Sequence, residues 1–564
     1  ILAPLHSHEP LVRILRDLYQ ERAPLPANLI LHAGLVVVFG GLLFAAWLIA
    51  RRWARPPAAE EAGLSRRAFL KAALISGAAA LPATAAASQW LRPQPAQAAA
   101  GETIVHRTGL GRALMRRPNI ILIVGDTVRA DHLGAYGNAS AKTPVLDAFA
   151  AESIRFTHMQ SQAPWTRPSF ATLFTSLYPS SHGTIYKTSV LPSRAVTLAE
   201  VLRAEGYITG GFGNNIHLSP LFHLNKGFDE YEYLAPNYLF GATESASQLA
   251  AYQVARRVNE GLFRQRDVHN FYQPAEVVTG KGLEWVRRHA GDRFFLMLHY
   301  MDAHDPYFEH PRNGYAVDAH DPYFEHPRNG YAIARVSLPN PRPELAPEMK
   351  RLYAGEIAYM DQHLGDLFAG LKQQGLYDDT LIIFTADHGE EFYEHGGWWH
   401  GTTLYQEQIH VPLLLKQPGF ADAGRVDEGL ARTLDLAPTI LAAAGLRAPA
   451  GFQGLDLLGQ APRAALSFSE TDHEGNIAQA VQSLEWKLVQ ATAGNPRGLP
   501  EQALFQLAQD PGETQDRSAA EAARVAELSG QIQDSLAYAQ ARAVAAAQTG
   551  LDAATLQQLR NLGY

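Results

Sequence analysis

The sequence predicts an α/β protein in which helices cover both faces of a β-sheet. Between Pro118 and about Gly454, short apolar runs alternate with helix-like stretches, as in ILIVG, VTLAEVLRAEG, FFLMLHY, LIIFTA and VPLLLK. This alternation is typical of a sheet sandwiched between helical layers. Beyond Gly459, short runs such as ALSFSE and WKLVQ indicate a small antiparallel sheet, and the Ala/Gln/Glu-rich composition from Ala519 onward predicts a helical tail.

The composition bounds the class of protein. The chain has 564 residues, of which 47% are hydrophobic and 18% charged, as expected for a globular protein. The formal net charge is −8 and there is no basic stripe, so nucleic acid is not an expected partner. The absence of cysteine excludes structural disulfides, Cys-based zinc sites and a nucleophile made by oxidising Cys.

The first hundred residues suggest a membrane and targeting region. We expect an N-terminal segment at 1–28 and a transmembrane helix at 29–50, because this run is apolar apart from one His and is long enough to span a bilayer. Arg51, Arg52 and Arg55 follow it, which predicts that this end faces the cytoplasm.

Residues 51–98 are expected to form a cytoplasmic loop and an export signal. Here SRRAFLK, with the pair Arg66 and Arg67, resembles a twin-arginine signal and precedes a second, mildly apolar stretch. In an alternative interpretation, residues 1–64 come from an over-extended gene start and only the export signal is real. Both interpretations place the rest of the chain outside the cytoplasm, in the periplasm or the extracellular space.

Two buried-strand patterns end in residues that can bind a metal ion. Asp126 follows the apolar run ILIVG, and Asp387 and His388 follow LIIFTA. Open α/β sheets build their sites at the carboxyl ends of strands. Thr166 lies between these patterns in the sequence, before a predicted helix, and a hydroxyl beside two carboxylates and an imidazole suits a metal-activated oxygen nucleophile. The set fits one divalent metal (Mn²⁺, Zn²⁺, Ca²⁺ or Mg²⁺), and the imidazole favours Mn²⁺ or Zn²⁺.

Several segments have an order and spacing that point to one protein family. They are PNIILIVGDTVRADHLGAYG, TPVLDAFAAESIRF, WTRPSFATLFTSLYPSSHG, HYMDAHDPY, TADHGEEFYEHGGWWHGTTLYQEQIHVPLLL, DLAPTILAAAG and FQLAQDPGETQD. Through them the chain resembles the sulfatase branch of the alkaline phosphatase superfamily. The resemblance implies a large mixed β-sheet sandwiched by helices, with a catalytic domain at 118–455, a small antiparallel-sheet C-terminal subdomain at 456–518 and a helical tail at 519–564.

The resemblance also implies roles for the candidate metal ligands. Asp126, Asp387 and His388 match ligand positions of the family, and Thr166 would complete the set. A second Asp usually follows the first ligand, but Thr127 stands there in this chain, so one charged ligand is missing.

Thr166 occupies the nucleophile position of the family motif C/S-x-P-S-R, which reads TRPSF here. Sulfatases oxidise Cys or Ser at this position to the aldehyde formylglycine, whereas oxidation of Thr would give a ketone. We therefore expect no formylglycine, and an unmodified Thr166 that forms a covalent ester. Phe170 replaces the Arg that supports the modified residue in the family, and Ser169 aligns with the motif's supporting Ser.

Two histidines compete for contact with the anionic group of the substrate. The family has one such residue after the FFLMLHY-type strand, but DAHDPYFEHPRNGYA at 302–316 recurs unchanged at 318–332. His304 directly follows the strand and is preferred over His320. The duplication is local, because repeat architectures need three or more units.

Four further residues are expected near the site from the resemblance. His400 is expected to bind the anion, protonate the leaving group or ligate a second metal, and His395 is a second candidate for that position. His182 either supports the nucleophile helix next to the substrate or is structural. Asn215 stands where many sulfatases carry a Lys-Trp-His string, as a weak substitute for a sulfate-binding Lys.

These features predict a metal-dependent hydrolase of sulfate or phosphate esters that works through Thr166, with phosphate diesters favoured. One alternative is a phosphodiesterase or a phosphoethanolamine- or phosphoglycerol-type transferase. A second is a catalytically silent relative that binds an anionic glycan or lipid headgroup. The expected partners are a small-molecule, glycan or lipid-headgroup ester and, through the N-terminal segment, a membrane.

Overall fold

The computed structural model describes residues 117–236, 272–305, 307, 343–545 and 547–548. The segments predicted at 1–28, 29–50 and 51–98 lie outside these residues, and so does His320. Within the described part of the chain, no helix is both long enough and apolar enough to cross a membrane.

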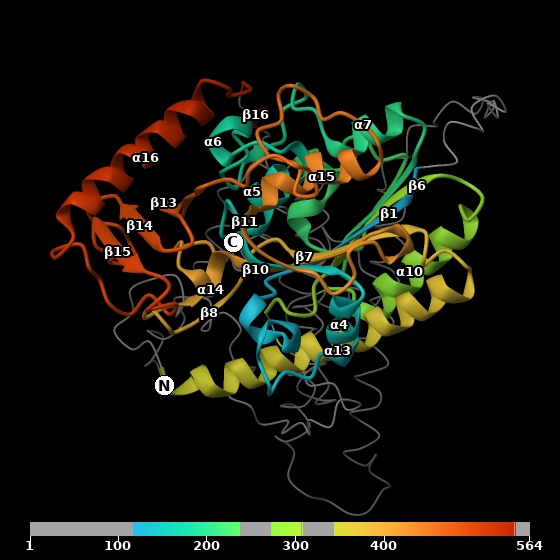
Figure 1. Cartoon of the computed structure of the whole chain (residues 1–564), viewed down its shortest axis with the longest axis horizontal. Coiled ribbons are helices and arrows are strands. Elements are labelled where there is room, and N and C mark those ends of the chain that lie inside the picture. The colour runs from blue at the N-terminus through green and yellow to red at the C-terminus, as the bar shows by residue number, and fades with distance from the viewer. Residues whose placement is uncertain (1–116, 237–271, 306, 308–342, 546, 549–564) are drawn as a thin grey trace, which may run out of the picture. The chain divides into compact units, whose positions relative to one another are not determined.

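A mixed eight-stranded sheet forms the centre of the described chain, with strand order β11-β2-β10-β7-β1-β6-β4-β5 (Figure 1). Strand β10 runs antiparallel to both of its neighbours, and the other neighbouring pairs are parallel. The strands are β1 (Asn119–Gly125), β2 (Ile154–Gln160), β4 (Ile208–Gly213), β5 (Glu230–Tyr233), β6 (Phe294–Tyr300), β7 (Thr380–Ala386), β10 (His410–Lys416) and β11 (Val426–Arg432). The predicted large mixed sheet is therefore confirmed.

Helices cover both faces of this sheet. One layer contains α4 (Pro144–Ala151), α10 (Ala275–Arg288) and α13 (Ala346–Gln373). The opposite layer contains α5 (Thr166–Thr175), α7 (Leu198–Ala204) and α15 (Leu436–Ala443) (Figure 1). This is the sandwich that the alternating sequence pattern predicts.

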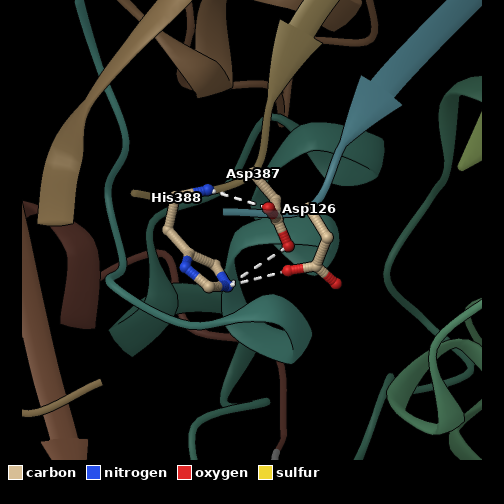
Figure 2. Close-up of side chains that lie close together, drawn as sticks. All are labelled: Asp126, Asp387 and His388. Carbon is tan, nitrogen blue, oxygen red and sulfur yellow. Dashed lines mark hydrogen bonds and ion pairs between the residues drawn. The ribbon is translucent and has the colours of Figure 1, made fainter. Parts of the chain in front are cut away.

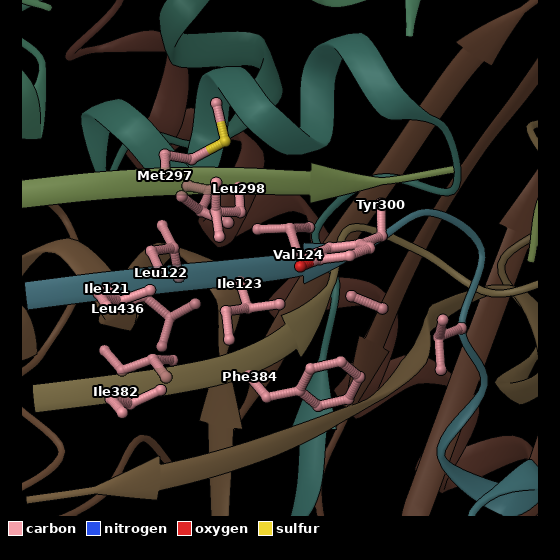
Figure 3. Close-up of a cluster of buried hydrophobic side chains, with 14 of the residues drawn as sticks. Ile121, Leu122, Ile123, Val124, Met297, Leu298, Tyr300, Ile382, Phe384 and Leu436 are labelled. Atoms are coloured by element: carbon pink, nitrogen blue, oxygen red, sulfur yellow. The ribbon is translucent and has the colours of Figure 1, made fainter. Parts of the chain in front are cut away.

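The core lies between these layers. Strands β1, β6 and β7 are buried along their whole length, because helices cover both of their faces. Figure 3 shows Ile121, Ile123, Ile382 and Phe384 among the packed side chains. Each fully buried side chain of this kind stabilises the fold by about 1.5–3 kcal/mol. The three central strands are thus a rigid support for whatever their ends carry.

The pairing of these strands places the candidate site. Gly125, the last residue of β1, pairs with Tyr300 of β6 and with Ala386 of β7. Because the three strands are parallel, the residues that follow them emerge at the same edge of the sheet. Asp126 and Asp387 are therefore brought together although they are far apart in the sequence. Thr127, the residue after Asp126, lies 260 positions before Asp387.

The second sheet has four antiparallel strands in the order β12-β13-β14-β15. They are β12 (Ser467–His473), β13 (Asn476–Gln482), β14 (Trp486–Ala491) and β15 (Gln502–Gln506). Helix α16 (Ala522–Gln540) packs on one face through Leu528 and Ile532, and the other face contacts Leu404 and Ile409. The predicted small antiparallel subdomain is present, whereas the residue limits given to the domains stay predictions.

Short elements complete the described chain. They are α6 (Pro179–His182), α14 (Gln406–Ile409), β3 (Ser189–Val190), β8 (Glu391–Phe392), β9 (Trp398–Trp399), β16 (Ala547–Gln548) and the 3-10 helices η2 (Ala130–His132), η3 (Gly134–Tyr136), η4 (Ile216–Leu218), η5 (Pro220–Phe222), η9 (Pro343–Leu345), η10 (Pro418–Phe420) and η11 (Thr433–Asp435).

Candidate active site

Asp126, Asp387 and His388 converge at the edge of the sheet where β1 and β7 end. Each offers one ligand atom, these atoms lie within 4.8 Å of one another, and all three residues are buried. Figure 2 shows the His388 ring facing both carboxylates, with Nε2 3.6 Å from Asp126 Oδ1 and 3.4 Å from Asp387 Oδ2. The three predicted strand-end ligands therefore form one group.

Hydrogen bonds on the outer atoms turn the inner atoms of Asp387 and His388 toward this group. Asp387 Oδ1 accepts from the backbone N–H of Thr127 at 3.3 Å and of His388 at 2.9 Å. His388 Nδ1 lies 3.0 Å from the carbonyl oxygen of Gly389, which can only accept, so Nδ1 carries the proton and Nε2 the lone pair. Asp387 thus presents Oδ2, and His388 presents Nε2.

Two buried carboxylate oxygens in the group lack a hydrogen-bond partner among the described residues. They are Asp126 Oδ1 and Asp387 Oδ2, the atoms nearest to His388 Nε2. Buried polar atoms are nearly always satisfied, so an orphaned pair beside an imidazole lone pair needs an explanation. Two anionic oxygens and one neutral imidazole nitrogen are a donor set that fits a divalent cation.

The ionisation of these three side chains also favours a bound cation. Burial and the charge of Asp126 raise the pKa of Asp387 well above its usual value. Burial would also raise the pKa of Asp126, but the charge of His304 and the contact with His299 hold it below its usual range. Burial lowers the pKa of His388 to about 4, so its ring is neutral near pH 7. A cation would offset the repulsion between the two carboxylates.

The Thr166 hydroxyl lies beside this group. Thr166 is the first residue of α5 and is buried. Its Oγ1 is 3.3 Å from His388 Nε2 and 3.4 Å from the Asn215 side-chain amide. The N-terminus of a helix carries a partial positive charge, which favours an oxyanion or an anionic substrate at this place. The arrangement suits attack by Thr166 on an ester of a strong acid.

The neighbouring Ser169 is held away from such a role. Its Oγ donates a hydrogen bond of 2.6 Å to the backbone carbonyl of Asp387, which Ser161 Oγ also contacts at 2.6 Å. Both hydroxyls contact the turn that carries the candidate metal ligands Asp387 and His388. The supporting role expected of Ser169 stays a prediction.

Asn215 enters the site more directly than expected. Its Nδ2 donates to Asp126 Oδ2 at 2.9 Å, and its Oδ1 accepts from the backbone N–H of His217 at 3.0 Å. The amide therefore bridges a ligand and the Thr166 hydroxyl. His217 in turn contacts Arg167 at 2.7 Å, and this buried guanidinium also donates to the carbonyl of Tyr186.

His304 and His400 line up with His388. The ring centroids of His388 and His400 are 4.4 Å apart, and those of His400 and His304 are 5.0 Å apart. His400 Nδ1 lies 2.9 Å from Glu390 Oε1, and the Tyr307 hydroxyl donates to Glu390 Oε2 at 3.1 Å. His400 therefore packs against the candidate ligand His388, and His304 packs against His400.

The structure places His182 and His395 in other surroundings. His182 Nδ1 accepts from Thr184 N, and its Nε2 lies 3.1 Å from Thr172 Oγ1, so the ring braces α5. His395 lies 2.6 Å from Glu407 and stacks on Tyr405 at a centroid distance of 3.7 Å. Their predicted contact with substrate stays untested, and the structural alternative for His182 agrees with its contacts.

Thr127, which stands in place of a second Asp, contributes through its backbone. Its φ is +57°, which is rare for a β-branched residue, and its Oγ1 donates to the carbonyl of Ala303 at 2.6 Å. The preceding Gly125 allows this turn, because a Cβ there would lie 2.7 Å from Val128 Cγ2. The side chain points to a carbonyl, while the N–H holds Asp387.

Sequence reasoning missed two residues that contact the predicted ones. His299, the residue before the last of β6, lies 3.3 Å from Asp126 Oδ2, and Glu390 contacts His400. The available signals were a His inside the apolar run FFLMLHY and the acidic pair that follows Asp387-His388-Gly389.

Comparisons with known proteins identify the relatives of this chain. The sulfatase family model matches residues 118–446, and the model of the N-sulphoglucosamine sulphohydrolase C-terminal region matches residues 393–542. Human arylsulfatase A is 31% identical over 393 residues, which cover 64% of this chain and 71% of that protein. The multifunctional alkaline phosphatase superfamily protein PehA of Trinickia caryophylli is 28% identical over 404 residues, covering 61% of this chain and 77% of that protein.

Solved structures share the fold. The phosphonate monoester hydrolase of Silicibacter pomeroyi superposes with a TM-score of 0.59 at 23% identity, covering 77% of this chain and 99% of that one. A protein solved with its substrate D-glucosamine-2-N,6-O-disulfate gives a TM-score of 0.58 at 19% identity, covering 75% and 98%.

Proposed function

Because the chain belongs to the sulfatase family and is an ester-bond hydrolase, we propose that it cleaves phosphate diesters through a covalent ester on Thr166. The observation that carries this proposal is the position of the Thr166 hydroxyl. It lies 3.3 Å from His388 Nε2, at the start of α5 and beside two orphaned carboxylate oxygens. No cysteine is present to supply a formylglycine, and Thr cannot be oxidised to an aldehyde.

We propose that Asp126, Asp387 and His388, together with Thr166, hold one divalent cation. When bound, it would lower the pKa of the Thr166 hydroxyl and offset the charge of the group being transferred. The orphaned oxygens Asp126 Oδ1 and Asp387 Oδ2 support this assignment.

In the proposed reaction, the Thr166 hydroxyl releases its proton to solvent, and Thr166 Oγ forms a bond to phosphorus while the bond from phosphorus to one alcohol oxygen breaks. The departing oxygen takes a proton from His400, whose ring is oriented by the hydrogen bond to Glu390. Water then attacks phosphorus: its oxygen stays on the released phosphate monoester, one of its protons passes to Thr166 Oγ, and His400 regains a proton from solvent. His304 and the Asn215 amide would contact the non-bridging oxygens, and the N-terminus of α5 favours their charge.

Sulfate esters are the second candidate substrate class. The match of residues 393–542 to the N-sulphoglucosamine sulphohydrolase C-terminal model favours it. An unmodified Thr166 argues against it, because the family's sulfate chemistry uses an aldehyde hydrate that expels sulfate by elimination. An alcohol in place of water in the second step would make the enzyme a transferase.

A substrate panel tests the proposal. The purified chain is stripped with a chelator, reloaded with Mn²⁺, Zn²⁺, Mg²⁺ or Ca²⁺, and assayed with bis(4-nitrophenyl) phosphate, 4-nitrophenyl phosphate and 4-nitrophenyl sulfate. We expect metal-dependent turnover with the highest kcat/KM for the diester. Turnover of the sulfate ester alone would contradict the phosphate proposal, and full activity after chelation would contradict the metal centre. Glycerol and ethanolamine as added acceptors would reveal transferase activity.

The duplicated segment provides an independent test of the anion contact. His304 has its position fixed by β6, and its ring lies against His400. We therefore propose that His304→Ala lowers kcat/KM for the diester much more than His320→Ala. The reverse order would assign the contact to the second copy.

We also propose that the catalytic part acts outside the cytoplasm, as a membrane-attached or exported enzyme. The support is the sequence at 29–50 and the pair Arg66 and Arg67. Replacing both arginines by Lys should leave the precursor in the cytoplasm, as seen by fractionation. Normal export of that variant would show that the segment is an ordinary membrane anchor.

A further inference from the structure

His299 is a buried histidine near the end of β6. It is not one of the candidate ligands, and the proposed reaction assigns it no role. Its Nδ1 accepts a hydrogen bond from the backbone N–H of Asn214 at 3.3 Å, so the ring proton resides on Nε2. That Nε2 lies 3.3 Å from Asp126 Oδ2, a close but poorly aligned contact. Among the described residues, this N–H has no better partner. Such contacts are often long in the unliganded state and tighten when the site is filled.

Asp126 Oδ2 thus faces two donors, of which only the Asn215 amide makes an aligned hydrogen bond, while Oδ1 has no donor. The Asn215 amide donates to Oδ2 at 2.9 Å, and His299 approaches the same oxygen. Oδ1 lies 3.6 Å from His388 Nε2 and has no hydrogen-bond partner. Two consecutive residues hold both donors. The backbone N–H of Asn214 binds the His299 ring, and the side chain of Asn215 itself donates to Oδ2. Together they set the rotation of the carboxylate about its Cβ–Cγ bond.

Phe170 packs directly against the His299 ring. Phe170 stands where the motif otherwise carries Arg, and a phenyl ring can donate no hydrogen bond. Its ring meets the His299 ring edge to face, with centroids 5.1 Å apart and planes at 81°. Phe170 therefore restricts the orientation of the His299 ring.

We propose that His299 is a positioning residue for Asp126: its Nε2–H holds Oδ2, so that Oδ1 is presented to the cation. The inference rests on the proposed metal centre and is independent of the attack by Thr166 and of the ester that is cleaved. Partners that orient a metal ligand typically change metal affinity by about 10- to 100-fold when they are lost. The effect is on cation binding itself and needs no substrate.

The test is the dissociation constant for Mn²⁺, measured by titration calorimetry on the full chain after removal of metal. His299→Leu removes the donor and should weaken Mn²⁺ binding by about 10- to 100-fold. His299→Gln places an amide N–H near the position of Nε2 and should keep most of the affinity. The matched control is His363→Leu, another buried histidine, which contacts Asp366 on α13 and should leave the Mn²⁺ affinity unchanged.

A folded His299→Leu variant that binds Mn²⁺ within twofold of the wild type would overturn the inference. If His299→Leu does not fold, the comparison of His299→Gln with His299→Asn decides, because the shorter Asn cannot reach Asp126 Oδ2. If His299→Gln retains its Mn²⁺ affinity and His299→Asn does not, the inference is supported. Equal Mn²⁺ affinities of the two variants overturn it. Absence of Mn²⁺ binding by the wild type would overturn the metal centre and this inference with it, whereas loss of diester turnover with normal Mn²⁺ binding would count against the proposed reaction alone.

Discussion

Replacing Asp387 by Asn should stabilise the metal-free protein and abolish its stabilisation by a divalent cation. The ligand oxygens of Asp126 and Asp387 lie within 4.8 Å of one another, and both side chains are buried. Two unit charges at that distance repel by about 3.5 kcal/mol at an effective dielectric constant of about 20. Proton uptake relieves part of this cost, so we expect the neutral Asn to raise the free energy of unfolding by about 1–3 kcal/mol at neutral pH.

The effect should depend on pH with a defined sign. Burial and the charge of Asp126 raise the pKa of Asp387 in the folded chain. The folded state therefore holds a proton that the unfolded chain releases, and the metal-free protein loses stability as the pH rises above the unfolded pKa of about 4. Asp387→Asn removes this titrating group. The difference in free energy of unfolding between the metal-free variant and the metal-free wild type should therefore grow as the pH rises above about 4.

The cation should reverse the order of stability. At a concentration of about 100 times Kd, a bound cation stabilises the wild type by about 2.7 kcal/mol, or about 5 °C in Tm for a large domain. The Asn variant has lost one anionic ligand and should show almost no shift.

The assay is thermal unfolding in chelator and in increasing Mn²⁺, at several pH values. Asp292→Asn is the control, because it removes one exposed negative charge from the segment that precedes β6, whereas the ligand group lies where β1 and β7 end. The reasoning would be refuted by an Asn variant that is less stable than the wild type in chelator, or that gains as much Tm from Mn²⁺ as the wild type does.

Three other predictions concern the rest of the chain. Lys487→Met should lower the free energy of unfolding by about 3–5 kcal/mol in chemical denaturation, because it leaves the buried Glu513 without its ion-pair partner at 2.7 Å; replacing Glu513 by Gln as well should recover part of the loss. Burial lowers the pKa of His395, but the hydrogen bond to Glu407 outweighs it and raises the pKa to about 9. The stabilisation is full below the unfolded pKa of about 6.5 and is lost as the pH rises to about 9, so His395→Gln should flatten the dependence of denaturation midpoints on pH between these values. Deleting residues 318–333 should leave most of the diester turnover, and a complete loss would show that the second copy is required.

The sequence alone predicted the site residues that directly follow β-strands. Asp126 and Asp387 each follow an apolar run that forms a fully buried strand, and parallel strands end at one edge of a sheet. Local pattern and a general rule of α/β folds therefore predicted their meeting. The Thr166 position followed from its motif and from the helix that begins there.

The histidines show where the sequence falls short. His395 and His400 are five residues apart, and His400 was the first and His395 the second candidate for one position, but the hairpin β8–β9 separates them. It leaves His395 with Glu407 and returns His400 to His388. Only the turn of this hairpin decides between them.

His299 could not be assigned from its own segment. In FFLMLHY it is one polar residue in a core strand. Its contact with Asp126 depends on the pairing of β6 with β1 and on the hydrogen bond from Asn214. Long-range register thus determined which histidines contact the site, and local pattern did not carry that information.

The most direct test of the account is to trap the covalent ester on Thr166. The metal-loaded protein is mixed with bis(4-nitrophenyl) phosphate, quenched in acid within the first turnover, digested and analysed by tandem mass spectrometry. We expect that the peptide containing Thr166 gains one 4-nitrophenyl phosphoryl group on that residue, that Thr166→Ser retains some turnover, and that Thr166→Ala shows neither adduct nor turnover. Wild-type turnover by Thr166→Ala would show that water attacks the ester directly, and the central claim would be wrong.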